Sequence, residues 1–358
     1  MKIKWLYYAL LFGVLAMVLH TLLDSEPPWD SSRPSIYRHL RDNETATGLS
    51  EKGILLPDEE EYQKRHGSTP WAAGGLDSVQ AFQDDRGEGG ADTARTIEAA
   101  IRRVLSTSGR AATDDLYALI LAEPSTIGFI DELLDRLWSD PPGAPTPFRD
   151  FAYWLATESP DRNAVKLGMA LLRLINNPPT KELVTLGLHD EFTLYAIIAL
   201  ENTGGPPAIL GMAKRVHGWG RVIAVQNLAK SQRWRVEEWL VREGFRNTID
   251  IGLTALPCAV GGKMADQLRK YRDTEPHWRK DDGLLPGACE IMITLMLDGP
   301  MEGMEDYDKG AEVTELLLGL LDDAPADQET YLIYALETKR FLESSYLDWE
   351  YPVPYTPL

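Results

Sequence analysis

The sequence has few cysteines and none of the short motifs that mark common catalytic or cofactor sites. Two cysteines among 358 residues are too few for a disulfide framework or a zinc ribbon. The chain contains no P-loop, dinucleotide-binding fingerprint, HExxH, CxxC or nucleophile elbow. We therefore expect no cofactor, and no motif indicates a reaction.

Positive charge is also scarce. The chain has 36 Lys and Arg against 55 Asp and Glu, which gives a net charge of -19. This balance disfavours binding to the phosphate backbone of a nucleic acid. The apolar content of 44% and charged content of 25% are typical of a folded globular protein.

One long apolar run stands at the N-terminus. Residues 5–23 carry no formal charge, and about 20 apolar residues are needed to cross a bilayer. Because no small-x-small cleavage pattern follows, residues 1–24 are predicted to be an uncleaved, single-pass membrane anchor. The acidic Asp24 and Glu26 that follow favour an extracytoplasmic body, although Arg33, Arg38 and Arg41 oppose this orientation. A buried core helix or a removed signal are the alternatives.

Composition divides the rest of the chain into three parts. Residues 25–92 are acidic and rich in Pro and Gly without a sustained apolar period, which indicates a linker or an irregular wrap over the body. Residues 93–345 place apolar residues at helical spacing and show no alternating strand pattern, which predicts an all-α body. Residues 346–358 contain three prolines and several aromatics, so we expect an extended tail that docks on a partner or covers the last repeat.

A repeat of 28 residues runs through the middle of the body. Its reference positions are Leu172, Leu200, Leu228 and Leu256. A small residue lies four before each of them (Gly168, Ala196, Ala224, Gly252), and an apolar one lies five before (Leu167, Tyr195, Ile223, Ile251) and twelve after (Val184, Met212, Leu240, Leu268). These offsets place one face on a first helix, where the small residue admits a neighbour, and put the last position on a second helix. Helix pairs of this kind stack and share one core.

This pattern resembles the short HEAT-like (armadillo-type) α-α repeat family. The resemblance is carried by residues 161–272, about a third of the chain. It implies a right-handed α-α superhelix, or solenoid, of stacked helix pairs, and most proteins of this family bind other macromolecules. Fold alone is a weak guide to function here.

A basic and tryptophan-rich stretch within the repeats is the predicted contact face. Residues 205–246 hold eight Lys and Arg against three Glu, the reverse of the whole chain. Arg and Trp are the residues that dominate protein interfaces. The candidate binding residues are Arg215, Trp219, Arg221, Trp234, Arg235 and Trp239. The alternative is that acidic parts of the same chain neutralise this stretch.

Two histidines hold the same place in successive repeats. His189 and His217 both lie 11 residues before a reference leucine, so stacking brings them to within about 10 Å of each other. With Asp190 they form a candidate metal or substrate site, although a third assured ligand is missing. The simpler interpretation is that these histidines cap or pack at a turn.

The sequence thus predicts a membrane-anchored solenoid that acts as a protein-binding scaffold or adaptor. The alternative is a hydrolase or lyase whose site lies on the concave helical surface near His189 and His217. Cys258 and Cys289 lie in apolar contexts and are predicted to be buried free thiols, because packed helix axes are usually too far apart for a disulfide. The oligomeric state is open.

Overall fold

The computed structural model describes residues 26–67, 75–83, 90–107, 109–201, 205–274, 283–297, 303–321 and 329–344. The regular secondary structure of these residues is helical, apart from one two-stranded antiparallel hairpin. They form two compact units that divide after Gly220, and each unit is described by itself. The predicted anchor and the predicted tail lie outside the described residues. Within the described ranges, no helix is both long and apolar enough to cross a membrane.

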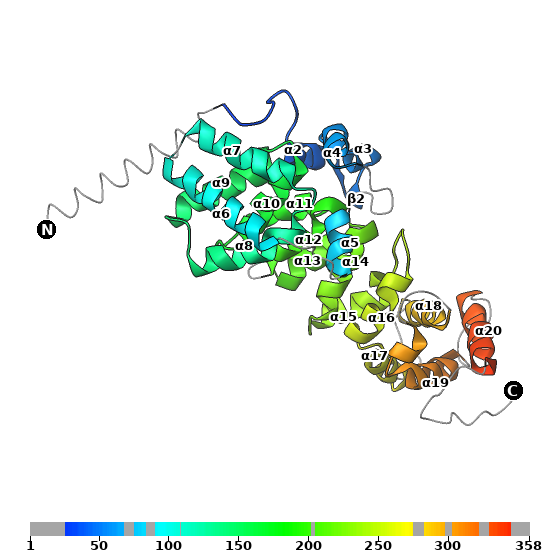
Figure 1. The fold of residues 1–358 in the computed structure, drawn as a ribbon. Helices are drawn as coiled ribbons and strands as arrows, with labels where there is room; N and C mark the ends of the chain where they lie inside the picture. Colours follow the sequence, from blue (N-terminus) through cyan, green and yellow to red (C-terminus); the bar gives the residue numbers. More distant parts are fainter. Residues whose placement is uncertain are drawn as a thin grey trace. The chain divides into compact units, whose positions relative to one another are not determined.

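The first unit carries the elements up to the start of α14 (Figure 1). They are α2 (Ile36–Asp42), β1 (Glu44–Thr45), β2 (Gly48–Leu49), α3 (Glu51–Ile54), α4 (Glu59–His66), α5 (Leu76–Phe82), α6 (Gly90–Thr107), α7 (Arg110–Ala122), α8 (Ile127–Ser139), α9 (Pro145–Glu158), α10 (Arg162–Leu172), α11 (Thr180–Leu186), α12 (Asp190–Leu200) and α13 (Gly205–Ala213).

Helix α10 lies at the centre of the first unit. It packs against α9 on one side and α12 on the other, and every residue of α10 is buried. The close approach of α9 requires Gly168, because a Cβ there would lie 2.5 Å from the backbone nitrogen of Ala156. The small residue of the repeat therefore has the role that the sequence predicts.

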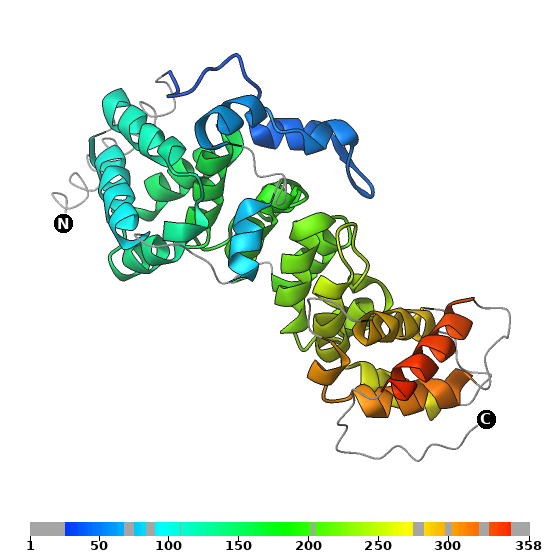
Figure 2. The ribbon, with the colours of Figure 1, turned by 45° about the vertical axis from the view of Figure 1, so that its right-hand side comes forward.

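The residues interpreted as a linker contain helices α2–α5. We call residues 26–67 and 75–83 the N-terminal segment. Helix α2 packs on α9 and α11, and α5 packs on α8 and α12. Figure 2 shows α2, α3 and α4 in dark blue and α5 in lighter blue beside the green helices. The segment is thus a folded part of the first unit.

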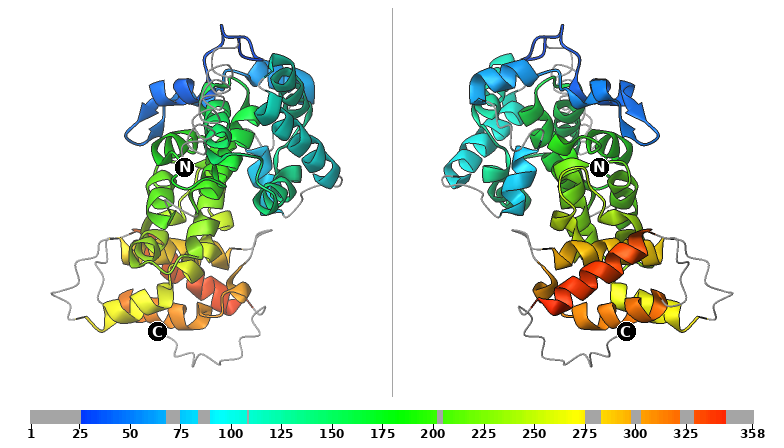
Figure 3. Two further views of the ribbon diagram at one scale, coloured as in Figure 1. Left: turned by 90° about the vertical axis from the view of Figure 1, so that its left-hand side faces the viewer. Right: turned by 90° about the vertical axis from the view of Figure 1, so that its right-hand side faces the viewer.

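The second unit contains most of α14 (Gly218–Ala229) and the helices that follow. They are α15 (Trp234–Trp239), the π-helical turn η2 (Leu240–Gly244), α16 (Gly252–Gly261), α17 (Met264–Arg272), α18 (Leu284–Met296), the 3₁₀ turn η4 (Met304–Asp306), α19 (Gly310–Leu321) and α20 (Glu329–Glu343). Helix α16 packs on α18, α17 on α19, and α18 on α20, so neighbours in sequence are neighbours in space. Figure 3 shows α20, in red, against the orange helices of this unit.

The repeat predicted from the leucine spacing is a structural repeat. All four reference leucines are buried, with exposed fractions of 8% or less. Leu172, Leu200 and Leu228 lie at or near the ends of α10, α12 and α14, whereas Leu256 lies in the middle of α16. Each of these helices is followed by a shorter one. At the position twelve residues later, Met212, Leu240 and Leu268 are fully buried and Val184 is half-buried. The sequential packing of helix pairs is therefore confirmed.

Candidate functional site

The two predicted histidines have different environments. His189 is buried, its Nδ1 accepts the N–H of Glu191 and its Nε2 is 2.9 Å from the carbonyl of Ile54. It therefore caps α12 and holds the N-terminal segment, and burial lowers its pKa so that the neutral ring is favoured. His217 is exposed. In the described part of the chain, no group of three or more His, Cys, Asp or Glu side chains is arranged to hold a metal ion.

Asp190 lies at the junction between two repeats. Its carboxylate accepts the N–H of Trp219 at 3.2 Å, in the first turn of α14. Burial raises the pKa of Asp190 to about 7, against the opposing effect of the N–H groups of Trp219 and Gly220. The backbone leaves room for this contact only because residue 218 is glycine with φ +64°, since a Cβ there would lie 2.1 Å from the carboxylate. Asp190 is therefore an N-terminal cap for α14.

Two of the six predicted contact residues face the N-terminal segment in the first unit. The Arg215 guanidinium donates to the carboxylate of Glu44 at 2.8 Å and to the carbonyl of Thr45 at 2.6 Å. The Trp219 ring is half-buried and packs edge-on against Phe82, with 5.8 Å between ring centroids. An acidic residue of the same chain thus neutralises Arg215, which is the alternative that the sequence left open.

The other four lie in the second unit. Arg221 and Trp239 are buried, and the Arg221 guanidinium lies over the Trp239 ring and donates to the carbonyls of Glu243 and Gly244. Their burial removes both from any contact surface. Trp234, 62% exposed, and Arg235, which lies over its ring, remain on the surface. The six residues do not form one exposed face.

A buried cluster of charges in the first unit was not anticipated. The Lys166 ammonium, fully buried in α10, pairs with Glu191 of α12 and lies 3.1 Å from a carboxylate oxygen of Asp77 in α5. Burial by itself would lower the pKa of Lys166, but the two carboxylates outweigh it and hold the pKa above its usual value. Conversely, Lys166 and Arg162 overcome the burial of Glu191 and lower its pKa to about 2. Lys166 and Glu191 are therefore both charged.

Arg162 extends this cluster one helical turn away. Its guanidinium donates three hydrogen bonds of 3.0–3.2 Å to the carboxylate of Asp58 and one of 2.6 Å to Glu59. Its flat face lies on the Tyr62 ring, 4.1 Å from the centroid. All three partners belong to the N-terminal segment, so the cluster fastens this segment to α10.

The signal for the cluster was present in α10. Arg162 and Lys166 are spaced four apart in a helix whose other residues, apart from Asn163, are apolar or glycine, so they lie on one face. Buried cations need carboxylate partners. The sequence does not reveal that these partners lie in the acidic segment, 104 residues earlier in the case of Asp58.

The loop between α8 and α9 forms one wall of a surface pocket. Pro141 and Pro142 cannot continue α8, Gly143 turns the chain with φ +89°, and Pro145 begins α9. The carbonyl of Asp140 accepts a hydrogen bond of 2.5 Å from Arg102 of α6. Two prolines and this bond restrict the loop, so the wall is formed before any ligand arrives.

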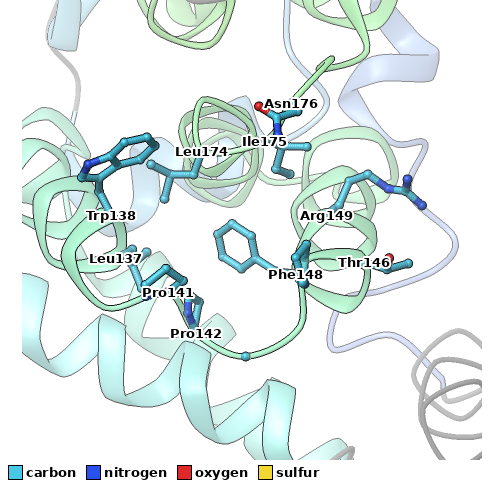
Figure 4. Close-up of a pocket in the computed structure, with 12 residues that line it drawn as sticks. Leu137, Trp138, Pro141, Pro142, Thr146, Phe148, Arg149, Leu174, Ile175 and Asn176 are labelled. Carbon is cyan, nitrogen blue, oxygen red and sulfur yellow. The ribbon is translucent and has the colours of Figure 1, made fainter. Parts of the chain in front are cut away.

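The pocket has a volume of about 440 Å³ and is mainly apolar. We call it the Trp138 pocket. Figure 4 shows Phe148 between Leu137 and Trp138 on one side and Arg149 on the other, with the residues after α10 above them. The full lining is Leu137, Trp138, Pro141, Pro142, Gly143, Pro145, Thr146, Phe148, Arg149, Leu174, Ile175 and Asn176. Trp138 is 73% exposed, whereas Phe148 is buried and only 6% exposed.

The fold defines the class of the protein as an all-helical array of sequentially packed helix pairs. No protein-family model matches the chain, and neither curated proteins nor solved structures show a significant similarity to it. Its function must therefore be argued from its own residues.

Proposed function

We propose that the protein is a helical-repeat scaffold that binds a protein partner through the Trp138 pocket. The observation that carries this proposal is the exposure of Trp138 at the rim of a restricted apolar pocket. A tryptophan next to a pocket with an arginine on its far side is the residue combination typical of interface hot spots. An exposed side chain of this size gains by being covered, at about 25 cal/mol per Å² of apolar surface.

The partner's chemistry follows from the lining. Leu137, Phe148 and Leu174 offer apolar contact, while the Arg149 guanidinium and the Asn176 amide can donate hydrogen bonds at the rim. Such a site fits an aliphatic or aromatic anchor side chain whose flanking backbone carbonyls accept those bonds. This proposal moves the contact from the predicted 215–239 stretch, which spans both units, to the α8–α9 region of the first unit.

The finer architecture and the location are part of the proposal. We infer a HEAT-like, right-handed superhelix from the 28-residue repeat. We also infer that residues 5–23 anchor the protein in a membrane as a single pass, with the body extracytoplasmic. The test is whether the full chain stays with the membrane at alkaline pH and its body is digested only from outside the cytosol.

The scaffold proposal is tested by comparing partners captured by three full-length proteins. They are the wild type, Trp138→Glu and Trp234→Glu, the last being a matched change at another exposed tryptophan. We expect at least one protein to be retained by the wild type and Trp234→Glu but lost with Trp138→Glu. The purified pair should then bind about 30-fold more weakly with Trp138→Glu, the loss typical of a hot spot.

Two outcomes would contradict the Trp138 pocket as the contact. In the first, Trp138→Glu captures every partner as well as the wild type does. In the second, a partner is lost with Trp234→Glu alone, and the contact face would then lie in the second unit. Circular dichroism of both variants controls for folding. Both should unfold like the wild type, because substitutions at exposed positions seldom change stability by more than about 0.5 kcal/mol.

A further inference from the structure

The last described helix of the second unit, α20, has two unlike faces. Tyr334 and Thr338 are buried, on the side that packs against α18 and α19. Leu332, Ile333 and Leu336 are exposed by 62%, 41% and 58%. In a stacked helical array, an outer face that no further helix pair covers is normally polar or covered by a cap.

We propose that residues 345–358 of the same chain cover this face of α20. This inference is independent of the Trp138 pocket. The fourteen residues begin directly after Ser344, the last described residue after α20. In an extended form they can span about 46–50 Å. Leu336 and Leu332 lie only about 12 and 18 Å back along the helix from that point, given the rise of 1.5 Å per residue.

The chemistry of the two partners is complementary. The segment YLDWEYPVPYTPL supplies aromatic and aliphatic side chains that match the exposed leucines and isoleucine. Its prolines restrict the chain in advance, which lowers the entropic cost of ordering it.

Charge supports the same match. Lys339 and Arg340 lie on the surface at the end of α20 where the segment departs. Their partners within the helix are at long distances, with 3.9 Å from Lys339 to Glu343 and 3.6 Å from Arg340 to Glu337, and both cations are exposed. Asp348 and Glu350 follow in the sequence a few residues after the end of α20. Pairing with them is therefore not blocked by strong existing bonds.

Site-specific cross-linking in the full-length protein tests the proposal. Trp349 is replaced by p-benzoylphenylalanine, and the products of irradiation are mapped by mass spectrometry. We expect cross-links within one chain to residues 329–343, with a yield that does not change on tenfold dilution. Leu336→Lys should lower that yield about tenfold, because it removes the apolar contact of one leucine. Val260→Lys, at a position 57% exposed in α16, is the matched control and should leave the yield unchanged.

Three results would overturn it. Cross-links found only in covalent dimers would show that a second copy covers α20. Cross-links confined to other parts of the chain, or none at all, would show that this segment does not cover the face. A yield equally insensitive to Leu336→Lys and Val260→Lys would show that the contact does not depend on the leucines.

Discussion

The same repeat position is used differently in the two units. The residues 11 before the reference leucines are Asp161, His189, His217 and Phe245. In the first unit, Asp161 pairs with Arg33 at 2.9 Å and His189 contacts the carbonyl of Ile54, so both hold the N-terminal segment. Phe245 of the second unit is fully buried and apolar. His217, the remaining member, is exposed. The same repeat position thus holds the N-terminal segment in two repeats and is an ordinary apolar core position in the second unit.

A substitution at Lys166 gives the strongest test of this difference between the two units. Lys166→Met keeps the length of the side chain but leaves Asp77 and Glu191 buried without their cation. We expect the free energy of unfolding to fall by about 3–5 kcal/mol, as when one partner is removed from a buried ion pair. Urea denaturation followed by circular dichroism measures the loss.

Lys263→Met in the second unit is the matched control. Lys263 pairs with Glu237 at the surface, with 47% of its side chain exposed, so the change should cost less than about 1 kcal/mol. Similar losses for the two variants would mean that the buried cluster contributes no more than a surface pair.

We expect small residues at close helix contacts to have the same packing role in both units. A Cβ at Gly168 would lie 2.5 Å from the backbone of Ala156, and one at Gly261 would lie 2.5 Å from the Cα of Ala229. Alanine at either position should destabilise its unit by roughly 1–3 kcal/mol through overpacking. Thermal unfolding of each variant tests this.

Glycines in open space provide the controls. A Cβ at Gly211 in α13 or at Gly319 in α19 would meet no neighbouring side chain or helix within 4 Å. Alanine there should be neutral or stabilise by up to about 1 kcal/mol, because it reduces the freedom of the unfolded chain. Equal effects at all four positions would refute close packing as the reason for the small residues.

The smallest expected effect concerns pH. The folded-state pKa of Asp190 is about 7, above its ordinary value of 3.8. The folded protein therefore binds this proton more tightly than the unfolded chain, and the stability it contributes is lost as the pH rises from about 4 through 7. A shift of this size corresponds to at most about 4 kcal/mol. Because Asp190 is only half-buried, solvent screening reduces the effect, and we expect a decrease of roughly 1–2 kcal/mol over that window in urea titrations.

Asp190→Asn should flatten this part of the stability profile, since asparagine can still cap α14 but does not titrate. His189, whose pKa burial lowers, contributes stability that increases with pH up to about 6.5, so the test is the difference between the two profiles. A profile that Asp190→Asn leaves unchanged would contradict the assignment. Glu191 has the opposite sign, but its pKa of about 2 places its loss of stability below pH 4.5.

The repeat could be predicted because its cause is local. The residue types at the repeat positions of Ala196, Leu200 and Met212 recur every 28 residues. Helix geometry alone places such positions on one buried face. The buried free thiols of Cys258 and Cys289 are confirmed for the same reason, because their apolar neighbours already indicate burial.

The fastening of the N-terminal segment could not be predicted in this way. Asp58 and Asp77 look like surface carboxylates in a Pro- and Gly-rich stretch, and only long-range folding brings them to Arg162 and Lys166. The Trp138 pocket has a similar origin, since its walls come from α8, α9 and the residues after α10. A single-sequence pattern indicates what each wall contains, but not that the walls meet.

The N-terminal segment is packed on the first unit from about Trp29 onward, which limits the length of any link between the proposed membrane anchor and the body. Trp29 stacks on Trp154 with 4.5 Å between centroids, and Arg33 is held by Asp161. If residues 5–23 span a bilayer, only a handful of residues separate the lipid from these fixed points, instead of a stalk of several dozen. The body would then lie close to the headgroups with little freedom to swing, and whatever it recruits would be held within a narrow zone above the membrane.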